Sequence, residues 1–444
     1  MAEQAARPLR RILGLGFGVA MVFGTMVGVG ILRLPSMVAA ALGDRTLVVA
    51  CWAVGGLYAL MGATAVSELA AMVPQAGGFR IYARRAFGEG CGFAIGWCDW
   101  LSNAGVLAYV SMTAAAFMGA LWPPAVMHER LVGLLLVSLF TALHLAGIRL
   151  ASSLTRVISV AVGLVLTVLV IACFIAAPVA SGPAVAGAAV RTGSLIAGAV
   201  TALRAVLLAY GGWYAPIYMA EENRDPTTTL PRAIIGGAFL VSVFYLVINV
   251  AFVHVLPIDV LSRSSLPAAD AARAVLPRGG AELVTVLSLL TVLSLMNNVL
   301  LMGPRVLFAI GRDGLFTQQA ARVSATGTPT VALLLTSVAA SAFVLSGTFE
   351  QTIALCAVLF LIEYVVTFAA VFVLRHREPK TARPYEAIAH PLSTAIVLAG
   401  SVVLLIAAAR ADPRSGILAA LFMAACIPCY AWIQRRRRPD AAAA

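Results

Sequence analysis

The sequence predicts an all-α membrane protein with 12 transmembrane helices. Hydrophobic residues make up 61% of the 444 residues and charged residues only 11%, whereas an average soluble domain is about half apolar and a quarter charged. The apolar residues also gather in long runs, and two of these runs contain glycine breaks. The formal net charge of +12 would suggest nucleic acid as a partner of a soluble protein. Here the basic residues fall in short loops beside the apolar runs, so we expect no nucleic acid partner.

Each predicted helix is an apolar run near the length that a bilayer requires, about 20 residues. In chain order the runs cover about 12–33, 46–72, 91–120, 131–147, 154–179, 193–220, 231–254, 281–310, 328–346, 351–374, 387–408 and 414–433. No linker or change of composition separates them. We therefore expect residues 1–444 to form one transmembrane domain in contact with the lipid bilayer.

Lysine and arginine are distributed unevenly over the loops between these runs. Of the 31, 21 lie on the side of the amino terminus, two lie within helices, and eight lie on the opposite side. The eight are Arg45, Arg130, Arg191, Arg263, Arg273, Arg278, Arg410 and Arg414. Because short cytoplasmic loops are enriched in basic residues, we expect a multi-pass protein of the cell (inner) membrane with both termini cytoplasmic. The run Arg435 to Arg438 is then expected to lie against anionic lipid.

Several classes of function lack support in the sequence. The five histidines are scattered, without the helical pairing that is typical of a metal site. No nucleophile and base occur in a pattern that indicates catalysis. We expect no metal, no cofactor and no enzymatic activity.

The two glycine breaks are the strongest indication of function. Gly28-Val29-Gly30 interrupts the first apolar run and Gly211-Gly212 interrupts the sixth. Non-helical backbone persists at membrane depth only where it lines a cavity or is buried in protein. The N–H groups of Gly28 to Ile31 could receive a carboxylate, and the carbonyls of Ala209 to Gly211 could receive an ammonium group. A single glycine break more commonly permits close helix contacts, but two breaks at matching positions favour a binding site for a zwitterion.

Seven segments resemble amino acid permeases of the amino acid-polyamine-organocation superfamily, in particular the L-type amino acid transporter branch. They are FGTMVGVGILRLP at 23–35, SELAAMVPQAGG at 67–78, AYGGW at 209–213, EENRDP at 221–226, LPRAI at 230–234, GPRVLF at 303–308 and RDGLF at 312–316. They occur in the order of the family and extend over most of the chain.

This resemblance implies a five-plus-five inverted repeat. Helices 1–5 (about 12–179) and 6–10 (about 193–374) form the two halves, and helices 11–12 (about 387–433) lie outside them, while helices 1 and 6 are discontinuous. The resemblance also implies that the unwound parts of helices 1 and 6 bind the substrate backbone, and that Trp213 closes over the substrate. Those parts correspond to Gly28, Val29, Gly30, Ile31, Tyr210, Gly211 and Gly212. Alternatively, Tyr210 and Trp213 are simple packing aromatics.

One departure from the family concerns coupling. Many sodium-independent relatives carry a lysine on helix 5, at a position near Val162, but the only lysine of this chain is Lys380. Proton coupling through that lysine is therefore excluded, while pure exchange, sodium coupling and proton coupling through another group stay open. Glu363 in the tenth run is our coupling candidate, because burial disfavours the charged form of a carboxyl group.

Two asparagines are further candidates for substrate contact. Asp99 and Asn103 lie four residues apart and thus on one helix face, and Asn103 corresponds to an asparagine in some arginine-exchanging relatives. Asn297 matches an asparagine that is common in helix 8 of the family. Hydrogen bonding between helices is an equally adequate account of both.

Together these observations predict a secondary active transporter, namely a permease, antiporter or ion-coupled symporter, with an amino acid substrate and a site near the bilayer midplane. Asp99 and Glu363 keep a polyamine or cationic amino acid exchanger open as the alternative. A channel is less well supported, because it needs a continuous polar pathway.

Overall fold

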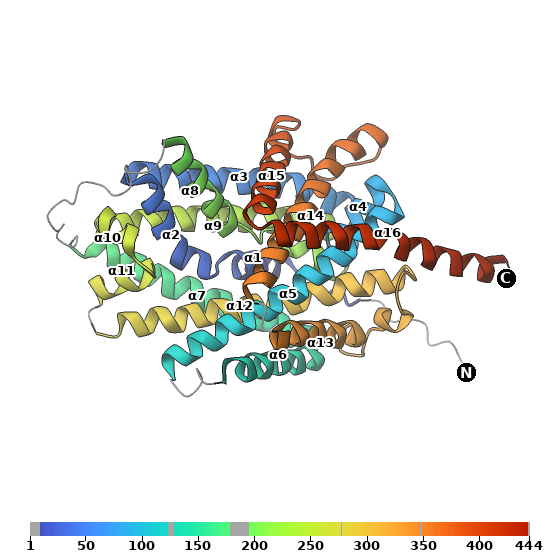
Figure 1. The fold of residues 1–444 in the computed structure, drawn as a ribbon, viewed down its shortest axis with the longest axis horizontal. Helices are drawn as coiled ribbons and strands as arrows, with labels where there is room; N and C mark the ends of the chain where they lie inside the picture. Colours follow the sequence, from blue (N-terminus) through green and yellow to red (C-terminus); the bar gives the residue numbers. More distant parts are fainter. Residues whose placement is uncertain (1–8, 123–127, 178–194, 277, 347–348, 443–444) are drawn as a thin grey trace.

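A computed structural model describes residues 9–122, 128–177, 195–276, 278–346 and 349–442. The side chains of Val29, Phe349 and residues 436–442 lie outside this description, as do Arg191 and most of the basic run at the carboxyl end. The described residues form helices joined by turns (Figure 1), and their only strand-like pairing is an isolated bridge between Leu13 and Asn223.

Sixteen α-helices and two 3₁₀-helices follow one another along the described chain. They are α1 (Leu15–Met26), α2 (Val29–Leu42), α3 (Arg45–Met72), α4 (Phe79–Phe87), α5 (Glu89–Leu121), α6 (Glu129–Ala146), α7 (Ile148–Ile175), α8 (Leu195–Ala209), η3 (Ala215–Glu222), α9 (Pro226–Val255), α10 (Ile258–Arg263), α11 (Pro267–Val275), α12 (Gly280–Arg312), η4 (Gln318–Ala321), α13 (Thr330–Ser346), α14 (Phe349–Arg377), α15 (Leu392–Ala411) and α16 (Pro413–Ala442).

Each of the 12 predicted runs falls on helix in the part of the chain that the structure describes. Nine helices there are long and apolar enough to cross a membrane, or ten if the bent pair α1 and α2 forms one span. The other two, α8 with 15 residues and α13 with 17, are apolar but shorter. The all-helical membrane fold is therefore confirmed, whereas the full count of 12 spans and the inverted repeat stay predictions.

The first run is longer than predicted. It was expected to end near residue 33, but α2 continues to Leu42, where Gly43 adopts a left-handed conformation with φ 64° and ends the helix. Asp44 then accepts a hydrogen bond from the N–H of Leu47, which caps α3. Arg33 does not end the helix, because its side chain is exposed. The apolar stem of an arginine can lie along a helix while its charged end reaches a polar surface.

Three short helices were not predicted, since none is long enough to span a bilayer. Helix α4 carries three arginines and lies toward one end of the molecule, the same end as the last turns of α16. Helices α10 and α11 lie toward the opposite end (Figure 1).

The broken first helix is enclosed by other helices. Helix α1 packs against α9, α7 and α12, while α2 packs against α8. Small residues make the contact with α9 close: a Cβ at Gly18 would lie 2.6 Å from Cβ of Ala233, and one at Gly237 would lie 2.6 Å from Cβ of Val22. Helix α15 packs outside this bundle on α14 and α3, and α16 packs on α14 and α5.

Candidate functional site

The break in the first helix lies between α1 and α2, whose axes differ by 47°. Gly28 is extended, with φ −130° and ψ −164°, and no side chain caps the helix that begins at Val29. The unwound part is thus shorter than predicted, because Gly30 and Ile31 already belong to the first turn of α2. Backbone N–H groups in a first turn have no partner within the helix and carry partial positive charge. This end of α2 can therefore bind an anionic group.

The second break separates α8 from η3. Residues 210–214 form turns between Ala209 and Ala215, and Gly212 has φ +113°. Only glycine adopts such a conformation readily, because it has no Cβ. A Cβ at Gly212 would also lie 2.9 Å from the carbonyl carbon and oxygen of Thr25. Glycine is thus required here both by the backbone conformation and by the approach of α1.

The two breaks meet in space, as the sequence predicted for a shared site. A Cβ at Gly30 would lie 3.5 Å from Cα of Ala209. The hydroxyl of Tyr245 in α9 donates to the carbonyl of Met26 at 2.6 Å and lies 3.5 Å from that of Ala209. Tyr245 therefore contacts the last carbonyl of each broken helix. Sequence reasoning missed it, since a single tyrosine in the apolar run 231–254 carries no distinguishing signal.

The rings of Tyr210 and Trp213 lie in helix interfaces. Tyr210 donates to the carbonyl of Trp52 at 3.1 Å, and its ring centroid is 5.1 Å from that of Tyr245. Trp213 stacks on Tyr364 and Phe368 of α14 at centroid distances of 5.9 and 6.3 Å. With 4% of its surface exposed, Trp213 is packed against α14 in this conformation. Its contribution to closing the site stays a prediction.

Asn103 and Glu363 belong to one buried cluster between α5 and α14. Asp99 accepts hydrogen bonds at one carboxylate oxygen, Oδ1, from Asn103 at 2.8 Å and from Tyr218 at 2.7 Å. Ser102 donates to Glu363 at 3.3 Å. Asp99, Asn103 and Glu363 are each 0% exposed. The candidates Asn103 and Glu363 therefore lie in one cluster with Asp99. Tyr218, which also bonds to Asp99, belongs to η3 after the second break.

Asn297 lies among different helices. Its amide nitrogen donates to the carbonyl of Ala151 and to the hydroxyl of Thr155, at 3.0 and 2.8 Å. Its amide oxygen is 3.0 Å from Nε2 of His144. These contacts tie α12 to α6 and α7, as the alternative of interhelical hydrogen bonding predicted. A substrate contact of Asn297 stays a prediction.

The neighbouring Asn298 connects this polar network to the first helix. Its amide nitrogen donates to the hydroxyl of Thr25 at 3.0 Å, and its amide oxygen accepts from Thr155 at 2.9 Å. A Cβ at Gly212 in the second break would lie 2.9 Å from the backbone of Thr25. Sequence reasoning missed Asn298, which directly follows the predicted contact Asn297.

Ion pairs join the segments that were expected on the side of the amino terminus. Arg305 of α12 and Glu222 of η3 form a buried pair at 3.0 Å. Asp313, after α12, pairs with Arg80 and Arg84 of α4 at 2.6 Å each. These contacts hold the ends of η3, α12 and α4 together.

Two further contacts extend this arrangement. The backbone N–H of Leu13 donates to the carbonyl of Glu222 at 2.9 Å, which places the start of α1 beside η3. Arg85 makes two hydrogen bonds to Glu378, after α14, and they lower the pKa of that carboxyl. The loops predicted to be cytoplasmic therefore gather at one end of the molecule.

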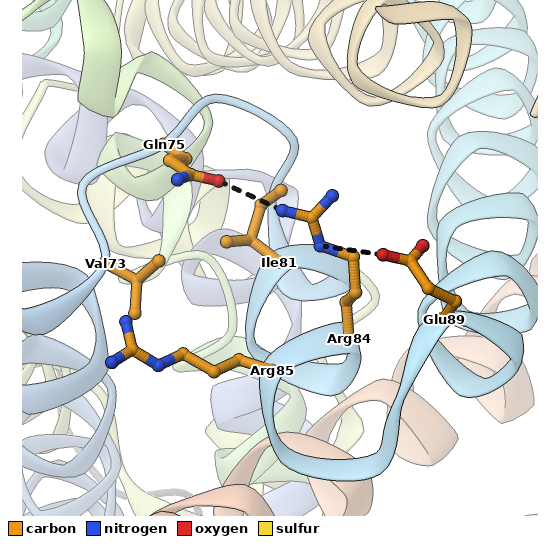
Figure 2. A pocket seen from close by; sticks show the side chains of 6 residues that line it. All are labelled: Val73, Gln75, Ile81, Arg84, Arg85 and Glu89. Atoms are coloured by element: carbon orange, nitrogen blue, oxygen red, sulfur yellow. Dashed lines mark hydrogen bonds and ion pairs between the residues drawn. The ribbon is translucent and has the colours of Figure 1, made fainter. Parts of the chain in front are cut away.

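A pocket of about 400 Å³ lies beside α4 (Figure 2). It is lined by Val73, Gln75, Ile81, Arg84, Arg85 and Glu89. Arg84 lies 3.4 Å from the side-chain oxygen of Gln75 and 3.9 Å from Glu89. None of the predicted site residues lines this pocket, and its arginines already have acidic partners. The helix breaks remain the candidate site.

Comparison with known proteins confirms the resemblance seen in the sequence. Residues 18–430 match the family described as amino acid permease. The serine/threonine exchanger SteT of Bacillus subtilis (strain 168) is 25% identical over 434 residues, which cover 97% of this chain and 98% of SteT. The b(0,+)-type amino acid transporter 1 of Mus musculus is 24% identical over 455 residues, which cover 98% and 92% of the two chains. An uncharacterized transporter of Mycobacterium tuberculosis is 30% identical over 266 residues, 60% of this chain and 58% of that protein.

Proposed function

Because this chain belongs to the amino acid permease family, and is thus a transporter and not an enzyme, we propose that it is a secondary active amino acid carrier. In this proposal the two sides of the molecule open alternately to one site near the bilayer midplane. We place this carrier in the cell membrane with both termini cytoplasmic. The basic loops support that orientation.

The observation that carries the proposal is the meeting of two broken helices. The start of α2 has no side-chain cap and offers N–H groups at Gly28 to Ile31, of which that of Gly28 faces the hydroxyl of Tyr245. The end of α8 offers carbonyls at Ala209 to Gly211. A carboxylate is stabilised at a helix amino terminus and an ammonium group at a carboxyl terminus. The α-carboxylate and α-ammonium groups of an amino acid match these two ends, and both are common to all amino acid substrates.

Coupling is the less constrained part of the proposal. SteT is by its name an exchanger, which supports exchange of one amino acid for another. Proton coupling would act through Glu363, since it is buried in α14 and, among the residues that the structure describes, makes one side-chain hydrogen bond, from Ser102. Sodium coupling is the remaining alternative.

Counterflow in proteoliposomes tests the proposed function. Purified protein should take up a labelled amino acid faster when the vesicles contain unlabelled amino acid, because acceleration from the opposite side is a property of carriers. The set should include serine, leucine, lysine and glutamate. An uptake rate that does not depend on the internal amino acid, or an ion current that does not saturate with ion concentration, would instead indicate a channel.

The variant Gly30→Leu tests the position of the site. A Cβ at residue 30 would make ordinary contacts, at 3.5 Å with Ala209 and 3.6 Å with Leu34, so the rest of the leucine side chain must occupy space beside the helix start. We expect uptake to be abolished while membrane insertion is intact. Normal uptake by a correctly inserted Gly30→Leu protein would remove residues 28–31 from the site.

A further inference from the structure

Three buried polar atoms between α5 and α14 lack hydrogen-bond partners among the described residues. They are Oδ2 of Asp99, Oδ1 of Asn103 and Oε2 of Glu363. The backbone N–H of Phe79 faces the Asp99 carboxylate, but it does not complete a bond to Oδ2 with good geometry. An ionised carboxylate and an amide oxygen can only accept hydrogen bonds. The described part of the cluster therefore lacks hydrogen-bond donors for these three atoms.

The cluster also lacks positive charge. The ion pairs found among the described residues all involve other acids, and neither Asp99 nor Glu363 has a basic partner there. Instead, the two carboxyl groups lie close enough to interact with each other. A buried charge without a partner is strongly unfavourable. A cationic ligand would supply both the donors and the charge.

Aromatic rings pack together beside the two acids. Tyr214 lies 4.9 Å from Phe79, 5.7 Å from Tyr364 and 6.1 Å from Phe360, measured between ring centroids. Phe79 lies 6.1 Å from Tyr218, whose hydroxyl bonds to Asp99. The face of an aromatic ring attracts a cation within about 6 Å of its centroid. A ring face turned toward the acids would favour an organic cation over a neutral polar group.

The cluster adjoins the helix breaks. Tyr214 is the last residue of the second break, directly after Trp213, and it is also the ring that contacts most of the others in the cluster. A substrate whose α-carboxylate lies at the start of α2 would therefore extend its side chain toward Asp99 and Glu363.

We propose that Asp99 and Glu363 bind the alkylammonium or guanidinium end of the substrate, with Asn103 as a third acceptor, so that the carrier recognises cationic amino acids. This proposal rests on the proposed function, because it assigns the side-chain part of the same site. An ammonium group has three donors and a guanidinium group has five, enough for the three unpartnered acceptors. A free diamine offers the same cation but lacks the carboxylate that the start of α2 would bind.

Access to the cluster is closed in this conformation. A Cβ at Gly78 would lie 2.5 Å from Oδ2 of Asp99 and 2.3 Å from the ring of Tyr218. The turn between α3 and α4 therefore covers the carboxylate. Release of a cation from Asp99 requires this turn to move when the α4 end of the molecule opens.

The test compares ligands of equal shape and different charge on the purified protein. L-Lysine, L-norleucine and cadaverine are titrated while the melting temperature is followed, since a ligand of the folded state raises it. Norleucine has the lysine stem without the ammonium group, and cadaverine has both amines without the carboxylate. We expect lysine to bind about tenfold or more tightly than norleucine, the ratio typical of hydrogen bonds to a charged group.

The variants Asp99→Asn and Glu363→Gln should each reduce the ratio of lysine to norleucine affinity about tenfold. The control is Glu350→Gln, which removes the same charge from an exposed position of α14 and should keep the ratio. Norleucine binding shows that a variant is folded. If neither variant folds, competition of lysine and norleucine for counterflow by the natural protein decides.

Three results would overturn the inference. Equal affinity for lysine and norleucine in the natural protein, or an unchanged ratio in a folded Asp99→Asn variant, would show that the cluster has only a structural role, while the proposed function would stand. Binding of cadaverine but not lysine would assign the cluster to free amines. Failure of every amino acid in counterflow would instead contradict the proposed function itself.

Discussion

Two separate features of the structure require glycine at position 212. The backbone has φ +113°, and a Cβ would lie 2.9 Å from the backbone of Thr25. We expect Gly212→Ala to lower stability by about 1–3 kcal/mol, the usual cost of such strain, and to abolish exchange because the two breaks can no longer meet. Thermal unfolding and counterflow measure these two effects.

The control for that prediction is Gly236→Ala. A Cβ at Gly236 in α9 would meet no atom within 4 Å, and alanine favours helix over glycine by about 1 kcal/mol. This variant should unfold at the same or a higher temperature and exchange normally. If Gly212→Ala behaves like Gly236→Ala, the close approach of the breaks is not needed for transport.

The side chain of Trp213 offers a test of gating. Its ring stacks on Tyr364 and Phe368, and a large rigid ring beside the break can exclude water from a bound substrate. We expect Trp213→Ala to slow exchange more than it weakens substrate binding, measured as the exchange rate and the half-saturating concentration. Exchange at the parental rate would mean that the ring is packing and that the gate lies elsewhere.

Helix α9 supports both broken helices through the hydroxyl of Tyr245. Tyr245 contacts the carbonyls of Met26 and Ala209, and loss of a buried hydrogen bond costs about 0.5–1.5 kcal/mol. We expect Tyr245→Phe to lower the melting temperature slightly and to slow exchange several-fold, because the carbonyl ends of α1 and α8 lose their shared partner.

Tyr58→Phe is the matched control for Tyr245→Phe. The hydroxyl of Tyr58 donates to the carbonyl of Val397 at 2.9 Å, so it ties α3 to α15 outside the breaks. Its removal should cost similar stability while exchange continues at the parental rate. Equal rates of exchange in both variants would argue that Tyr245 only packs.

Coupling belongs to the scale of the whole molecule, because it links the site to a gradient across the membrane. Glu363 is buried between α14 and α5 without a basic partner among the described residues, and glutamine keeps its size while it mimics the protonated acid. We expect Glu363→Gln to flatten the pH dependence of net uptake and to spare exchange of a neutral amino acid. Uptake between about pH 5 and pH 8, with and without a proton gradient, measures this effect. An unchanged pH profile would leave sodium coupling or obligate exchange.

The end of the molecule that contains α4 is held together by ion pairs that, unlike the breaks, could not be predicted from local sequence. Its contacts, such as Arg305 with Glu222 and Arg84 with Asp313, join residues that are far apart in the chain. The sequence showed these residues only as basic loops and family motifs. Their pairing depends on how η3, α12 and α4 come together.

The all-helical membrane fold, the approximate ranges of the helices and the location of both breaks could be predicted from the amino-acid sequence alone. These features depend on local sequence. An apolar run of spanning length satisfies its own backbone hydrogen bonds in lipid as a helix. Gly28 and Gly212 interrupt such runs whatever the neighbours of the helix are. Composition and the quoted motifs were sufficient to identify the family.

Which side chains share an environment became clear only from the packing of the helices in the structure. It placed Tyr245 at both breaks, Asn103 with Asp99 and Glu363, and Asn297 between α6 and α7. It also showed that Gly30 already lies in the first turn of α2, because cap geometry depends on how α1 and α2 pack on their neighbours. A polar residue in an apolar helix can face any of several neighbouring helices, and the packing of the helices decides which of them it contacts.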